Sequence, residues 1–112
     1  MANRTFRVYY SDPMQGRNRM NFQISGVNTT SVAIITATEY SRETVPPNHP
    51  DERRRHLGEA TVQVSNVSVH GDDGTPNSGV EFLVHVNAIV TLFAFVVVDI
   101  TILDSVLDIT HV

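Results

Sequence analysis

The sequence predicts an all-β protein: an antiparallel β-sandwich or partly closed barrel, jelly-roll-like, with about six strands and no substantial helix. Two observations support this fold class. Short stretches rich in valine, isoleucine, phenylalanine and threonine alternate with polar residues, as in strands with one buried face. Turn signals made of glycine, proline, asparagine and aspartate separate these stretches, a spacing typical of sandwiches and barrels.

Length and composition indicate one globular domain over residues 1–112. The chain is 41% hydrophobic and 18% charged, unlike a disordered sequence. It has no cysteine, which excludes thiol nucleophiles and thiolate metal sites and favours a cytoplasmic location. We also expect no signal peptide, because no charged and then apolar segment precedes the first strand.

Three strands are expected in the N-terminal part of the chain. The first alternates over residues 5–10, with Phe6 and Tyr10 on its inner face. A loop at residues 11–20, marked by Asp12-Pro13, precedes the second strand. The second and third strands show the same alternation and occupy residues 21–25 and 31–40.

A long polar segment, residues 42–58, is expected to form a loop, because its three prolines exclude a central strand. Within it, residues 51–55 are compatible with one helical turn that starts after Pro50. The segment also carries a basic cluster, a candidate for binding phosphate or carboxylate groups, although a self-neutralised solvated loop is the favoured interpretation. The cluster consists of Arg53, Arg54, Arg55 and His56.

Two further strands follow this loop. In residues 59–70 the valines change parity at Ser65-Asn66, which predicts a β-bulge, or alternatively two short strands joined by a tight turn. Residues 71–79 are rich in glycine and aspartate and predict a turn. Residues 80–87 alternate again, with valine and phenylalanine on the inner face.

The most apolar part of the chain, residues 88–98, is expected to open a sixth strand that continues to residue 103. It carries no charge, so both faces of the strand would need to be covered. A buried helix is the competing interpretation of the same apolar run. A strand engineered as an assembly interface would have the same apolar composition. We assign the even-numbered face to the core, because it continues through Ile100 and Ile102. The odd-numbered face is assigned to a neighbouring subunit, with contacts from Ile89, Phe93, Phe95 and Val97.

Charge is distributed unevenly along the chain. There is no lysine, all eight basic residues are arginines within the first 55 positions, and seven of the twelve acids follow residue 56. This layout suits ion pairs between the two halves or between subunits, although scattered solvated charges are the simpler interpretation. The net charge of −4 disfavours nucleic-acid binding, and the apolar run is too short to span a membrane.

Two residue groups are candidates for chemistry. His85 and Glu81 share a strand face and would serve as an acid–base pair if that face lined a cavity, although an ordinary strand histidine is the favoured interpretation. Asp72, Asp73 and Asn77 offer oxygen ligands for a metal ion, but their spacing does not match a calcium loop, and a plain turn is favoured.

The sequence therefore favours a non-enzymatic homo-oligomeric module, with a structural or ligand-binding role of lectin-like or assembly type and no cofactor. It would self-associate through residues 88–98 and use its three loops as a contact surface. The alternative is a small enzyme or small-molecule binder that uses His85 and Glu81, with its cavity between the sheets or at a subunit boundary.

Overall fold

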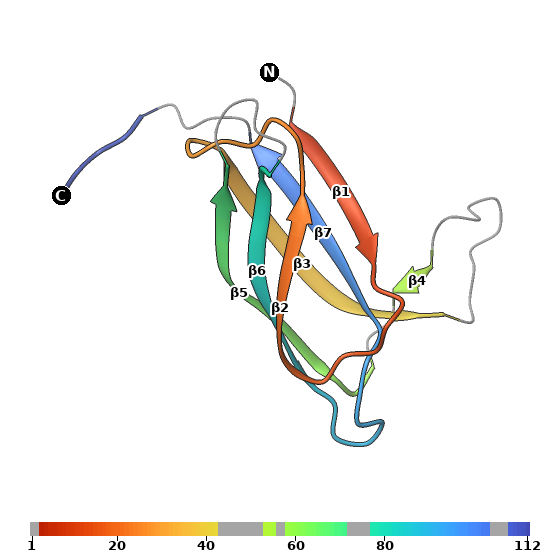
Figure 1. Ribbon diagram of the computed structural model, residues 1–112. Helices are drawn as coiled ribbons and strands as arrows, with labels where there is room; N and C mark the ends of the chain where they lie inside the picture. The colour runs from red at the N-terminus through yellow and green to blue at the C-terminus, as the bar shows by residue number, and fades with distance from the viewer. Residues whose placement is uncertain (1–2, 43–52, 56–57, 72–76, 104–107) are drawn as a thin grey trace.

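Two antiparallel sheets packed face to face make up the protein (Figure 1). The computed structural model describes residues 3–42, 53–55, 58–71, 77–103 and 108–112. These residues contain strands and no helix, so the predicted all-β antiparallel fold class is confirmed as a sandwich or partly open barrel. Among them, no helix is long and apolar enough to cross a membrane.

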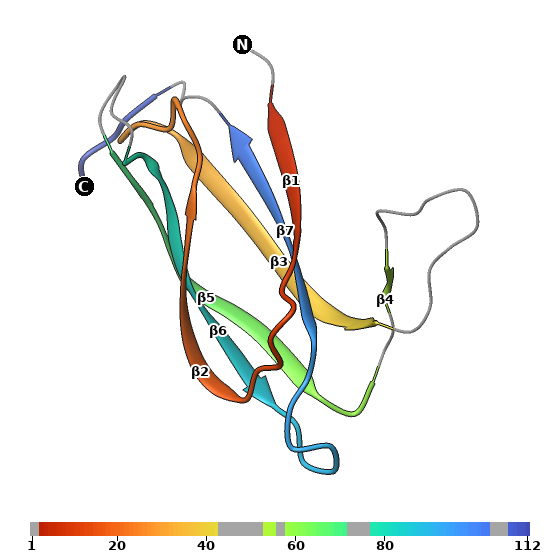
Figure 2. The same ribbon diagram turned by 45° about the vertical axis from the view of Figure 1, so that its right-hand side comes forward.

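Each sheet has its own strand order. The first sheet consists, in spatial order, of β1 (Arg4–Tyr9), β7 (Val96–Leu103), β3 (Val32–Ser41) and the short β4 (Arg54–Arg55). The second consists of β2 (Gly16–Gln23), β6 (Gly79–Asn87) and β5 (Thr61–His70). Successive strands lie in different sheets except for the pairs β3–β4 and β5–β6, so the chain passes repeatedly across the core (Figure 2).

The core lies between β6 and β7, each of which has a long strand on both sides in its sheet. Their even-numbered residues point inward and are at most 4% exposed. This confirms the assignment of the even-numbered face of the last strand to the core. The residues concerned are Val80, Phe82, Val84 and Val86 from β6, and Val96, Val98, Ile100 and Ile102 from β7.

The second strand is longer than expected. β2 begins at Gly16, so the loop predicted at residues 11–20 is wrong for its second half. From Gly16 to Gln23 this strand pairs with β6, and only its alternate residues Asn18, Met20 and Phe22 are partly buried. Polar residues are compatible with such an edge strand because half of its surface faces water.

The predicted bulge in the fifth strand is confirmed. The register between β5 and β6 shifts between Ser65 and Ser68, and Asn66 has a positive φ of 55°. Asparagine is among the residues that adopt this backbone conformation most readily. The helical turn considered for residues 51–55 is not found at residues 54–55, which pair with β3 as β4.

The strand predicted over residues 88–103 is wrong for its first half. β7 begins at Val96, and residues 88–95 form the connection between β6 and β7 that extends from one end of the sandwich (Figures 1 and 2). Leu92 has a φ of 66°, which breaks the extended backbone. Ala94 forms an isolated bridge to Met14 before the regular ladder starts.

Candidate functional site

The connection between β6 and β7, residues 88–95, is called the apolar loop here because of the side chains that it exposes. Ile89 is 72% exposed, Val90 79%, Leu92 68% and Phe93 47%. Contiguous apolar patches of more than roughly 300–600 Å² are rare on monomeric proteins and usually mark an interaction site. These four exposed apolar side chains lie within five consecutive positions, which makes this loop the leading candidate for a functional site.

A single carboxylate holds the backbone of the apolar loop. Glu59 lies just before β5, and its oxygens accept hydrogen bonds from the amides of Ile89 at 3.0 Å, Val90 at 3.1 Å and Thr91 at 3.2 Å. The Thr91 hydroxyl lies 3.0 Å from the same carboxylate. These bonds, first that from Ile89, lower the pKa of Glu59 because they stabilise its charged form.

The base of the apolar loop is fixed at two more points. The side-chain amide of Gln15 donates to the Ala88 carbonyl at 3.0 Å, and its oxygen accepts from the Ala88 amide at 2.9 Å. Met14 and Ala94 exchange backbone hydrogen bonds of 2.8 and 2.9 Å. Because these backbone groups already have partners within the chain, an apolar surface can cover the loop without depriving them of hydrogen bonds.

Leu92 combines exposure with an unfavourable backbone conformation. Its φ of 66° lies in the left-handed region, which costs a leucine roughly 1–2 kcal/mol, and its side chain is 68% exposed. Within the single chain, little packing offsets this cost. Unfavourable conformations of this kind tend to occur where a protein binds something.

A hollow of about 320 Å³, called the aromatic recess here, lies beside the apolar loop. Its aromatic walls come from Tyr40 at the end of β3 and from Phe93 and Phe95, with ring centroids 6.1 Å apart for Tyr40–Phe95 and for Phe93–Phe95. The guanidinium of Arg42 lies 4.9 Å from the centre of the Phe95 ring. Glu39 and Glu59 also line the recess, so charged residues as well as aromatic ones surround it.

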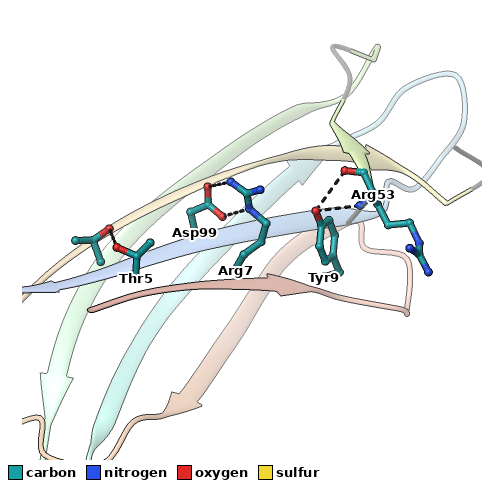
Figure 3. A network of polar contacts seen from close by, with 6 residues as sticks. Thr5, Arg7, Tyr9, Arg53 and Asp99 are labelled. Atoms are coloured by element: carbon teal, nitrogen blue, oxygen red, sulfur yellow. Dashed lines mark hydrogen bonds and ion pairs between the residues drawn. The ribbon is translucent and has the colours of Figure 1, made fainter. Parts of the chain in front are cut away.

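The tyrosines near the recess are held by hydrogen bonds. The Tyr40 hydroxyl donates to the Tyr10 carbonyl at 2.5 Å, and burial raises the pKa of Tyr40. Tyr9 packs edge-on against Tyr40 and bonds through its hydroxyl to both the amide and the carbonyl of Arg53 (Figure 3). This arrangement attaches the segment that contains β4 to the first sheet, close to the recess.

Figure 3 also shows how the outer face of β1 and β7 is joined. Arg7 makes two hydrogen bonds to Asp99, of 2.8 and 3.1 Å, across directly paired residues of the two strands. Asp99 is thus paired on an outer sheet face rather than buried in the core. Arg19 pairs with Glu81 in the second sheet, at 2.7 Å. Both ion pairs join an arginine of the first half to an acid of the second.

His85 and Glu81 lie on the outer face of the second sheet, and not in a cavity between the sheets. The His85 ring is 2.9 Å from the Ser65 hydroxyl, whereas Glu81 is paired with Arg19, which lowers the Glu81 pKa. Four positions along a strand separate the two residues by roughly 13 Å, so they do not contact each other. Glu81 borders a shallow hollow of about 240 Å³ to which His85 does not contribute. Their acid–base role stays a prediction.

The other predicted ligand groups are only partly within the described residues. Arg54 and Arg55 form β4, and Arg53 is held through its backbone, while His56 lies outside the described residues. Asn77 is an exposed turn residue, but Asp72 and Asp73 also lie outside that part of the chain. Among the residues that the structure describes, no three acids or histidines are grouped as a metal site would require.

The four predicted interface residues occupy different environments. Ile89 and Phe93 are exposed on the apolar loop, and Phe95 lines the recess. Val97 is only 2% exposed, because its own chain covers it. Sequence reasoning missed Val90 and Leu92, assigned to the core because a strand was assumed, and it missed the anchors Gln15 and Glu59, which no local pattern marks.

No protein-family model, curated protein or solved structure matches this chain. Its function is therefore inferred from the geometry of its own residues.

Proposed function

We propose that the protein is a non-enzymatic β-sandwich module that self-associates through its apolar loop and has a structural or ligand-binding role within that assembly. The observation that carries the proposal is the exposure of Ile89, Val90, Leu92 and Phe93 on one loop. Covering a patch of roughly 400 Å² yields on the order of 10 kcal/mol of gross hydrophobic free energy. Association entropy offsets much of this gain, so we expect weak to moderate affinity.

The anchoring of the loop supports the same proposal. Glu59 and Gln15 hold residues 88–91 in one conformation before any partner arrives. A fixed loop loses less conformational entropy on binding than a flexible one, which increases affinity.

The test is to remove the apolar side chains without disturbing the anchor. The double variant Val90→Gln with Leu92→Asn keeps the backbone bonds to Glu59 and places a residue that tolerates positive φ at position 92. Ile34→Gln is the matched control, because Ile34 is 53% exposed on β3, away from the loop.

Size-exclusion chromatography with light scattering is the measurement. We expect the wild type and Ile34→Gln to show the same assembly, and the double variant to elute at the monomer mass of 12.4 kDa. Identical assembly of the double variant and the wild type would contradict the proposal.

A further inference from the structure

We propose that, in the self-associated protein, the apolar loop of each copy enters the aromatic recess of the other. This inference rests on the proposed function and adds the surface that receives the loop. The partner is a second copy of this chain, related by a two-fold axis that passes beside the loop.

The two surfaces are complementary in shape and chemistry. The loop carries the exposed aliphatic side chains of Ile89 and Val90, and the adjoining recess is lined by the rings of Phe93 and Phe95. The loop does not fill its own recess, since Ile89 and Val90 remain more than 70% exposed. Because protrusion and hollow lie at the same end of one chain, a two-fold axis brings both contacts together at once.

The area involved favours this arrangement over contact between two loops alone. Two facing loops, each with a patch of roughly 400 Å², would bury about 800 Å² in total, the size of a non-specific crystal contact. Docking into the recess also covers the residues that line it, so it buries more apolar surface than two facing loops alone. The recess thus enlarges the contact that the loop makes.

The charged groups at the recess are compatible with burial. Glu59 is already bonded to the loop amides, and Glu39 accepts a hydrogen bond of 2.9 Å from the Ala60 amide. The incoming loop, residues 88–95, has no charged side chain, and the Glu59 carboxylate that accompanies it is already bonded to its amides. Each carboxylate beside the contact therefore keeps a hydrogen-bond donor when water is excluded.

A membrane surface fits the same loop less well. Loops and helices that insert at a bilayer surface are usually flanked by lysine and arginine, which are attracted to anionic lipids. The chain has no lysine and a net charge of −4, and the charges that border the recess are two glutamates and Arg42. These charges favour a protein partner over an anionic bilayer.

The absence of cysteine allows a direct test by cross-linking. One preparation carries Val90→Cys at the loop tip, a second carries Ser41→Cys in the recess, and Ile34→Cys serves as the control on the outer face of β3. Under mild oxidation we expect a mixture of Val90→Cys and Ser41→Cys to form disulfide-linked dimers at least about tenfold faster than either variant alone, because docking raises the effective concentration of the thiols. The mixture should exceed the control mixture of Ile34→Cys and Ser41→Cys by the same factor.

The possible results separate this inference from the proposed function. Rapid cross-linking of Val90→Cys with itself, and not with Ser41→Cys, would show loop-to-loop packing and overturn the inference alone. Assembly by light scattering without either cross-link would also overturn the inference alone. A chain that stays monomeric, including one that binds phosphatidylcholine vesicles as a monomer, would overturn both.

Discussion

At the scale of single residues, Glu59 makes more hydrogen bonds to the apolar loop than Gln15 does. Its carboxylate accepts three consecutive amide hydrogen bonds, from residues 89–91, and these lower its pKa. Residues 89–91 of the loop are therefore held by the charged form of one side chain. Sequence alone did not reveal this anchor, since Glu59 and Ile89 are thirty positions apart and meet only after the sandwich has formed.

The anchor makes the loop sensitive to acid. Because the pKa of Glu59 is lowered in the folded protein, its contribution to loop stability is complete above the ordinary carboxyl pKa of 4.5 and is lost as the pH falls through the lowered value. We expect amide hydrogen exchange at residues 89–91 to become faster, relative to the other strand connections, below pH 4.5. In Glu59→Gln, the extra pH dependence of hydrogen exchange at residues 89–91 should disappear. If this pH dependence persisted in the variant, a group other than Glu59 would control the loop.

Leu92 gives a second prediction at this scale. Replacing it with asparagine removes an exposed apolar side chain and relieves an unfavourable φ of 66°. We expect Leu92→Asn to raise the free energy of unfolding of the monomer by up to about 1 kcal/mol in urea denaturation, while weakening self-association. A loss of monomer stability would show that Leu92 packs within its own chain.

At the scale of elements, sequence patterns predicted the strands in which apolar and polar residues alternate. β3, β5 with its bulge, and β6 lie within one or two residues of the expected ranges. The patterns failed for β2, whose polar residues belong to an edge strand, and for residues 88–95, whose apolar residues form a loop. An apolar sequence indicates only that a segment avoids water, and a subunit contact satisfies that requirement as well as a core does.

The core strands give a prediction for stability. Ile100 of β7 is fully buried between the sheets, so Ile100→Ala should lower the free energy of unfolding by about 2–5 kcal/mol in urea denaturation. The control is Thr36→Val on the exposed face of β3, which we expect to change stability by no more than about 0.5 kcal/mol. Equal effects of the two substitutions would contradict the position assigned to the core.

At the scale of the whole molecule, the ion pairs Arg7–Asp99 and Arg19–Glu81 and the exposed apolar loop lie in different regions. Arginines of the first half pair with acids of the second on the outer sheet faces, as Arg7–Asp99 and Arg19–Glu81 show. Such exposed pairs add little to stability because water and salt screen them. The exposed apolar side chains of the β6–β7 connection lie instead at one end of the sandwich, which leaves that end suited to contact with another copy.

Sedimentation equilibrium of the wild-type protein over a wide concentration range tests this account most directly. If the apolar loop drives self-association, the average mass rises with concentration from 12.4 kDa toward at least twice that value. Adding salt should leave this rise intact or strengthen it, because the contact is apolar. A mass that stays at 12.4 kDa at every concentration would contradict the central claim.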